Sequence, residues 1–134
     1  MLESQGIAAL AEFKLGNRRR ADVMGLDADG RFVIVEIKSS LADYRADSKW
    51  PDYIPYCDRF YFAVDPAFPR QELCRPAAWP DRTGLIIADG FSGAILREAA
   101  EIALPPARRR ALLIRFGRMA ADRLSRRNAG AIPV

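Results

Sequence analysis

The segment at positions 31–38, "RFVIVEIK", restricts the fold more than any other part of the sequence. Its three successive β-branched residues at positions 33–35 favour a strand inside a sheet. The strand then ends on a carboxylate and an ammonium, Glu36 and Lys38. Because side chains alternate along a strand, these two charged groups point to the same side. We therefore expect a sheet built around this segment, with charged side chains gathered where the strand ends.

The rest of the sequence predicts an α/β domain with a mixed β-sheet and a long C-terminal helix. Apolar alternation and turn residues predict strands at 7–15, 20–26, 31–38, 59–65, 84–88 and 94–97. Helical spacing predicts a helical turn at 2–5 that ends at Gly6, and short helical pieces between 39 and 57 capped by Ser39 or Ser40. It also predicts a short helix at 71–74 and a long helix over about 105–127. The "DGFSG" stretch at 89–93 predicts a hairpin turn.

The turn "DADG" predicts which residues of two strands lie opposite each other. A three-residue loop at 28–30, with a positive φ at its glycine, makes Asp27 face Arg31. The same register places Asp22 opposite Glu36, with Cβ atoms about 5 Å apart. A loop of two or four residues would shift this register by one and separate the two acids.

Two carboxylates at that separation are unfavourable unless a cation lies between them. Lys38 is one candidate, and a divalent ion is the other, because Mg²⁺ prefers oxygen ligands and commonly takes one or two carboxylates. The ligand set expected from the residues is Asp22, Glu36 and the carbonyl of Ile37, with Mg²⁺ (or Mn²⁺) as the ion. The alternative is that Glu36 and Lys38 are merely solvated at a strand end and Asp22 is an ordinary edge residue.

Composition limits the chemistry that this chain can perform. It has no histidine, which excludes His-based acid–base catalysis, Ser-His and Cys-His nucleophiles and most zinc sites. The two cysteines are isolated, no apolar run approaches a membrane span, and the first residues lack a basic leader segment. We expect a cytoplasmic protein of one domain, 1–134, without membrane contact.

Charge is unevenly distributed along the sequence. The net charge is +4, but the segment from position 105 onward contains eight arginines and one acid, so it carries +7 and the preceding residues carry −3. A basic helix on a mildly acidic domain suggests a polyanionic partner such as nucleic acid. Arginine-rich surface helices also occur in proteins that bind no polyanion.

The combination "RADV…VIVEIKSS" resembles the PD-(D/E)XK nuclease superfamily, whose motif is an Asp on one strand followed by Glu-x-Lys on the next. Here the matching residues are Asp22, Glu36 and Lys38, and Ala21 stands where the motif has Pro. The longer run from Glu12 to position 64 is similar to the MmcB group of bacterial DNA-repair endonucleases. The resemblance implies a restriction-endonuclease-like fold and a metal-dependent DNA endonuclease, with Glu12 or Glu3 as a possible third acid.

Further residues are expected to contact DNA. Arg18 and Arg19, immediately before the first acid, are candidates for phosphate contacts. By resemblance, Lys49 and Tyr53 are candidates for phosphate contact and substrate positioning, and Trp50 could stack on an exposed base. The alternatives are a solvated turn for the two arginines, a solvated Lys49 and a core position for Trp50.

The function expected from these observations is hydrolysis of DNA phosphodiesters in repair. The alternative is a DNA-binding or scaffolding module that has the nuclease fold but no catalysis, and a ribonuclease also remains open. A homodimer is possible, because enzymes of this class often cut both strands as dimers, although no segment of the sequence marks an interface.

Overall fold

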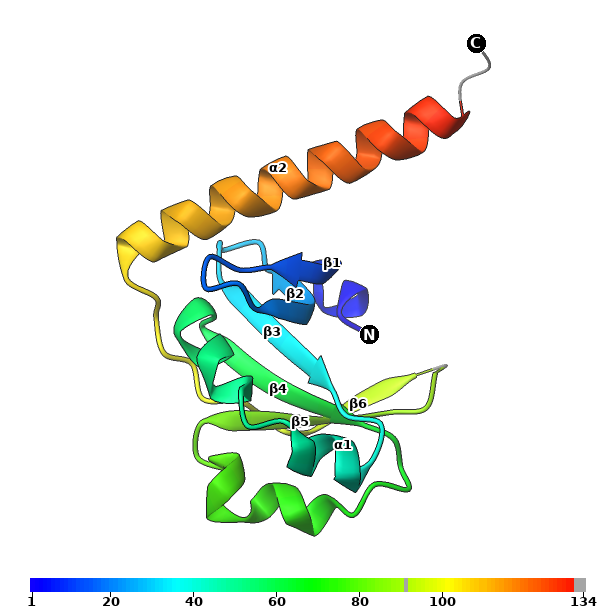
Figure 1. Cartoon of the computed structure of the whole chain (residues 1–134), viewed down its shortest axis with the longest axis vertical. Helices are drawn as coiled ribbons and strands as arrows, with labels where there is room; N and C mark the ends of the chain where they lie inside the picture. The colour runs from blue at the N-terminus through cyan, green and yellow to red at the C-terminus, as the bar shows by residue number, and fades with distance from the viewer. Residues whose placement is uncertain (91, 132–134) are drawn as a thin grey trace. The chain divides into compact units, whose positions relative to one another are not determined.

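The computed structural model describes residues 1–90 and 92–131, and the chain divides into two compact units, 1–104 and 105 onward. The first unit is built on a six-stranded mixed sheet in the order β1-β2-β3-β4-β5-β6 (Figure 1). Its strands are β1 (Ala8–Lys14), β2 (Arg20–Leu26), β3 (Phe32–Ile37), β4 (Arg59–Val64), β5 (Thr83–Ala88) and β6 (Gly93–Arg97). The predicted mixed sheet is confirmed, and the expected strands differ from the observed ones by at most one residue at either end.

The direction of pairing changes twice across the sheet. β1, β2 and β3 pair antiparallel, β3, β4 and β5 pair parallel, and β6 returns antiparallel to β5. The parallel β3–β4 connection contains the short helix α1 (Leu41–Ala46) and the 3₁₀ helix η2 (Trp50–Tyr56). Two more 3₁₀ helices, η3 (Arg70–Cys74) and η4 (Pro76–Ala78), connect β4 to β5. The broken helix expected after β3 is therefore present.

One face of the sheet is covered by α1 and η2. The ring of Tyr44, in α1, packs edge-on against Phe62 with centroids 5.6 Å apart. The ring of Trp50, in η2, packs against Phe60 and Phe62 at 5.5 and 5.0 Å. Glu36 belongs to this face, because it pairs with Phe62 in the parallel register. The charged end of β3 therefore points toward the helical layer.

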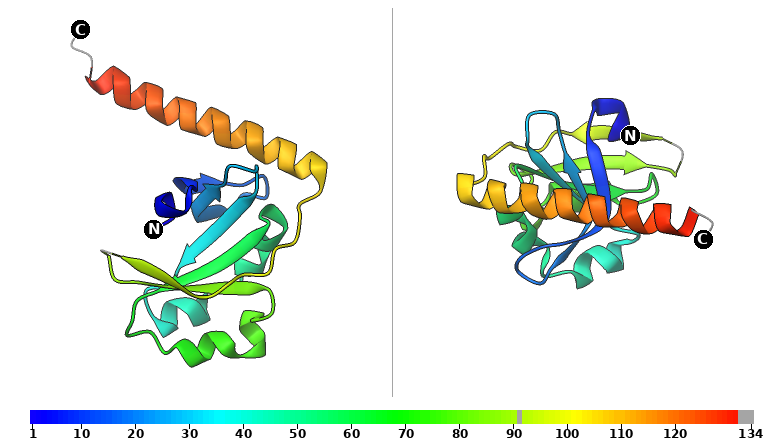
Figure 2. Two further views of the ribbon diagram at one scale, coloured as in Figure 1. Left: turned by 180° about the vertical axis from the view of Figure 1, so that it is seen from behind. Right: turned by 90° about the horizontal axis from the view of Figure 1, so that it is seen from above.

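The opposite face carries a second apolar cluster, which includes Val33, Val35, Tyr61 and Ile86. The N-terminal 3₁₀ turn η1 (Glu3–Gln5) contributes Leu2 just before it and ends at Gly6, whose φ of 73° is left-handed, as predicted. Seen from above, η1 and α1 lie on opposite sides of the sheet (Figure 2). One face of β3 therefore packs against α1 and η2, and the other face packs against the apolar cluster beside η1.

The β2–β3 hairpin has the predicted register. The Asp27 N–H donates to the Arg31 carbonyl at 3.0 Å, and Gly30 has a φ of 82°. The regular pairs run from Leu26–Phe32 to Val23–Val35, so the next pair along the two strands is Asp22 and Glu36. A three-residue loop thus aligns the two acids.

The second unit is one long helix, α2 (Pro106–Ala131), which confirms the predicted C-terminal helix and extends a few residues beyond it. Asp122 and Arg126 form an ion pair along it at 3.1 Å. Within the described part of the chain, no helix is both long enough and apolar enough to cross a membrane. Position 91, in the predicted hairpin turn at 89–93, lies outside the described residues.

Candidate active site

Two carboxylates lie together where β2 and β3 leave their regular pairing. The Asp22 N–H donates to Glu36 Oε1 at 2.9 Å, and the Ile37 N–H donates to Asp22 Oδ2 at 2.8 Å. Each carboxylate therefore binds a backbone amide of the opposite strand, which fixes both side chains. The two acids are adjacent, as the hairpin register predicts.

The end of β3 inverts the usual distribution of polar and apolar side chains. Glu36 and Lys38 are only 4% and 6% exposed, whereas the apolar Ile37 between them is 55% exposed. Two charged groups on the inner side of a strand end are costly to bury unless partners compensate them. This burial excludes the alternative in which Glu36 and Lys38 are solvated.

The environment of Glu36 raises its pKa to about 8. Burial is the largest cause; the negative charge of Asp22 and a side-chain hydrogen bond to Asp22 raise it further. The hydrogen bond from the Asp22 N–H and the positive charge of Lys38 act in the opposite direction. Glu36 therefore keeps its proton at neutral pH when no cation is bound.

Lys38 has a partner that the sequence analysis did not identify. Its Nζ lies 2.5 Å from Asp47 Oδ2, and Asp47 is the residue that ends α1. The other oxygen of Asp47 accepts the N–H groups of Lys49 and Trp50 at 2.8 and 3.1 Å. Burial raises the pKa of Asp47, but the Lys38 hydrogen bond and charge and these amide bonds lower it more, so the net pKa falls. Asp47 is thus an ionised acid fixed next to Lys38.

Asp22 and Glu36 form the acidic centre of this site. In the described part of the chain, no group of three or more His, Cys, Asp or Glu side chains is arranged to hold a metal ion. Glu12, a possible third acid, lies in β1 between Ala11 and Phe13, which pair with Val23 and Ala21, and has a left-handed φ of 53°. Glu3 lies in η1. The role of Glu12 stays a prediction, and so does that of the Ile37 carbonyl.

The turn between β1 and β2 is fastened to η2 beside the acids. Asn17 Nδ2 donates to the Asp52 carbonyl at 3.1 Å, and Arg19 Nε donates to the Asp52 carboxylate at 3.1 Å. The Tyr53 hydroxyl donates to the Arg20 carbonyl at 2.9 Å. Arg19 and Tyr53, both expected to contact DNA, therefore have intramolecular partners that connect two segments far apart in the sequence.

The charges around Tyr53 show that it lies near the acidic centre. Its pKa is raised to about 12, first by burial and then by the negative charges of Glu36, Asp47 and Asp22. The phenol therefore keeps its proton at neutral pH and serves as a hydrogen-bond donor. Its role toward a substrate stays a prediction.

Three other residues expected to contact DNA differ in exposure. Arg18 and Lys49 are exposed, one in the β1–β2 turn and one at the start of η2. Trp50 is only 4% exposed, and its ring packs among Phe60, Phe62 and Trp79. The expectation that Trp50 stacks on a base was wrong, because its ring belongs to the core. The stated alternative, a core tryptophan, is the correct one.

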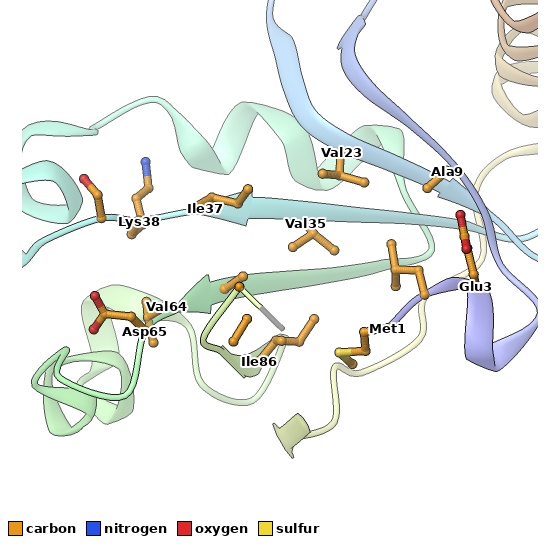
Figure 3. Close-up of a pocket in the computed structure, with 15 residues that line it drawn as sticks. Met1, Glu3, Ala9, Val23, Val35, Ile37, Lys38, Val64, Asp65 and Ile86 are labelled. Carbon is orange, nitrogen blue, oxygen red and sulfur yellow. The ribbon is translucent and has the colours of Figure 1, made fainter. Parts of the chain in front are cut away.

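A hollow with a volume of about 660 Å³ lies on the other face of the sheet. Its lining is mostly apolar, from Val23, Val35 and Ile86 among others, with Lys38 and Asp65 at one end and Met1 and Glu3 at the other (Figure 3). The paired acids do not line it. The two acids therefore lie outside this hollow, whereas Lys38 borders one end of it.

A known protein family matches nearly the whole chain. The family described as DNA repair protein MmcB-like matches residues 1–131. A protein of unknown function from Silicibacter pomeroyi has a similar structure, with a TM-score of 0.86 and 40% identity over 99% of this chain and 88% of that one. A repair endonuclease from Pyrococcus abyssi has a TM-score of 0.40 and 18% identity over 75% of this chain and 42% of its own. No curated protein matches.

Proposed function

The chain belongs to the MmcB-like family of DNA repair proteins, and from that premise we propose that it is a metal-dependent DNA endonuclease. The observation that carries the proposal is the cluster of half-buried Asp22 with buried Glu36 and Lys38 at the ends of two paired strands. The resemblance to the PD-(D/E)XK motif selects the same three residues. A protein that only folds has no need to bury an acid and a lysine beside a second acid, because such groups are costly to desolvate.

The acidic centre fits a divalent cation. Asp22 and Glu36 each use one oxygen to accept a backbone N–H, and they are close enough for a side-chain hydrogen bond between them. Such a pair offers hard oxygen ligands, which Mg²⁺ and Mn²⁺ prefer. A bound cation would stabilise negative charge on a phosphate and lower the pKa of a coordinated water. Asp22 and Glu36 would hold it, and the Ile37 carbonyl is a candidate for a further ligand.

The chain's own groups would orient the reactants. The backbone bonds of Asp22 and Glu36 keep both carboxylates in place before substrate arrives, so little reorganisation is needed. Lys38 offers its ammonium to the attacking water or to the charge that develops on the phosphate. The protonated phenol of Tyr53 and the exposed Lys49 would position the backbone near these groups.

The binding surface we propose combines the β1–β2 turn with the start of η2. Arg18 and Lys49 are exposed there, and the bonds from Asn17 and Arg19 to Asp52 hold the two segments together. Cations on such a fixed surface would contact phosphates without reading the base sequence. DNA is accordingly the proposed partner, with binding that weakens as salt rises.

The test is a nicking assay with duplex, branched and single-stranded DNA, and with RNA, in Mg²⁺ or Mn²⁺. Asp22→Asn and Glu36→Gln should abolish cleavage, and Lys38→Ala should abolish it while leaving DNA affinity nearly unchanged. Asp29→Asn is the matched control, because it removes one exposed carboxylate from the opposite end of the β2–β3 hairpin. Cleavage that survives Asp22→Asn or Glu36→Gln would refute the proposed site.

A second candidate function is a DNA-binding module without catalysis. The observation in its favour is that the described residues supply two clustered acids and no third, while Lys38 is occupied by Asp47. This function predicts DNA binding that is unaffected by Asp22→Asn, and no nicking by the wild-type protein in either metal. The same panel therefore separates the two functions.

A further inference from the structure

We propose that Asp47 is the positioning residue for Lys38, holding the ammonium at the acidic centre in the geometry that cleavage requires. The inference rests on the proposed function, since it assigns a role within the same site. The sequence motif contains Lys38 but does not say what fixes a flexible four-carbon side chain. In this structure the salt bridge to Asp47 Oδ2 does so.

The contacts of Asp47 make it a rigid anchor. It lies nine residues beyond Lys38 in the chain, after α1 has turned back toward the strand end. Its second oxygen accepts the amides of Lys49 and Trp50, and the Trp50 ring is fixed in the aromatic core. The carboxylate thus cannot rotate freely, and the ammonium that it binds is held through it to the core.

The burial of both partners argues against a chance surface pair. The side chains of Lys38 and Asp47 are 6% and 19% exposed. A lysine this deeply buried needs a counter-charge, and the Asp47 carboxylate supplies it. Without Asp47 the ammonium would be expected to leave its place or to bind the acids, where it would compete with a cation.

The geometry also provides a matched control in the same loop. Asp43 stabilises the first turn of α1 by accepting the Ser39 N–H at 3.0 Å, and its own N–H donates to Ser40 Oγ. The hydrogen bonds of Asp43 go to Ser39 and Ser40, so Asp43→Asn disturbs the loop without removing the partner of the ammonium. A difference between the Asp43 and Asp47 variants therefore reports on Lys38 and not on loop stability.

The first experiment is nuclear magnetic resonance of the lysine side-chain ammonium groups in the full-length protein without metal. The wild-type protein should give a slowly exchanging signal, assigned by its loss in Lys38→Met, because a buried and ion-paired ammonium is protected from water. Asp47→Asn should remove this signal and Asp43→Asn should retain it. Retention of the signal in Asp47→Asn would overturn the proposal independently of any activity.

The second experiment separates kcat from KM in Mg²⁺-dependent DNA cleavage. Asp47→Asn should lower kcat by about 10- to 100-fold with KM changed by less than about threefold, as expected for a displaced catalytic group. Asp47→Glu should recover part of the rate, and Asp43→Asn should stay within about twofold of wild type. On a Lys38→Met background, Asp47→Asn should cost nothing further, because residues acting as one unit are not additive.

The outcomes distinguish failure of the inference from failure of the proposed function. Absence of cleavage by the wild-type protein would refute the nuclease and, with it, the role of Asp47. Normal cleavage by Asp47→Asn, or equal losses for the Asp43 and Asp47 variants, would refute the positioning role alone. An additional loss on the Lys38→Met background would show that Asp47 does not act through Lys38.

Discussion

At the scale of single residues, Glu36 carries the most consequential property of the site. Its side chain is almost completely buried and its pKa is raised from 4.5 to about 8 by burial and by the adjacent Asp22. Between these two pH values the folded chain keeps a proton that the unfolded chain has lost. The free energy of unfolding must therefore decrease as pH rises through this interval.

We predict a loss of stability between pH 5 and pH 8 in metal-free buffer, on the order of 1 kcal/mol per pH unit. Below pH 4.5 the carboxyl is protonated in both states, and above about 8 it is ionised in both, so the slope should flatten outside this range. Thermal or urea unfolding followed by circular dichroism measures it. Glu36→Gln should remove most of the slope, and Asp29→Asn should not.

Divalent cations should offset the loss of stability that occurs as pH rises. A cation that binds the folded chain at Asp22 and Glu36 must displace the proton of Glu36, so Mg²⁺ should raise the melting temperature more at pH 8 than at pH 6. Differential scanning calorimetry with and without Mg²⁺ tests this prediction. An equal effect of Mg²⁺ on wild type and on the double variant Asp22→Asn/Glu36→Gln would show that the ion binds elsewhere.

At the scale of elements, the sequence predicted those parts of the site that depend on local geometry. The hairpin loop at 28–30 is short, so its length and the glycine at its end fix the register that brings Asp22 beside Glu36. The approach of Asp47 to Lys38 was not predictable in this way. It depends on the length of α1 and on how the chain turns after it, which are set by packing.

The position of Trp50 likewise could not be predicted from the local sequence. Its segment, "SKWPDYIPYC", is polar and interrupted by prolines, and the sequence left two positions open for the ring, exposed for base stacking or packed in the core. The partners that bury it are Phe60 and Phe62 from β4 and Trp79 from the loop before β5. Those contacts come from segments 10 to 29 residues away, and no local pattern reveals them.

Packing between β4 and β5 gives a prediction about the sheet. A Cβ added at Gly84 would lie 2.3 Å from Tyr61 Cδ1 and 2.7 Å from the backbone N of Ala99. We expect Gly84→Ala to lower the free energy of unfolding by about 1–3 kcal/mol, the usual cost of overpacking. Gly16→Ala is the control, since nothing lies within 4 Å of the added carbon. Urea denaturation measures both, and equal stability of the two variants would contradict the prediction.

Substitution of the buried Asp58 should lower the free energy of unfolding more than substitution of Gly84. It is 0% exposed, and its two oxygens accept the N–H groups of Phe32, at the start of β3, and of Leu104, at 2.7 and 3.1 Å. Asp58→Ala would leave two buried amides without these acceptors, so we expect a loss of about 2–5 kcal/mol. Asp58→Asn keeps one acceptor oxygen and should lose less. Equal unfolding midpoints for wild type and Asp58→Ala would contradict this account.

At the scale of the whole molecule, the charge of the chain is divided between its two units. Residues 1–104 carry −3 and the segment from position 105 onward carries +7. The acidic part contains the proposed cation site, and such a domain by itself would repel DNA at long range. We therefore expect the arginines of α2 to supply much of the sequence-independent attraction, with the exposed cations near the site serving for local contacts.

The salt dependence of DNA binding tests this division. The logarithm of the binding constant should fall linearly with the logarithm of the salt concentration, and the double variant Arg115→Gln/Arg118→Gln should reduce the slope by about 2 if both arginines neutralise phosphates. Arg31→Gln/Arg75→Gln removes the same charge from residues that form ion pairs with acids of the first unit, and it should leave the slope nearly unchanged. Fluorescence anisotropy with a labelled duplex at several salt concentrations measures both slopes. If the two double variants lower the slope equally, net charge alone drives association. If the α2 variant leaves the slope unchanged, its arginines do not contact DNA phosphates and serve a different partner.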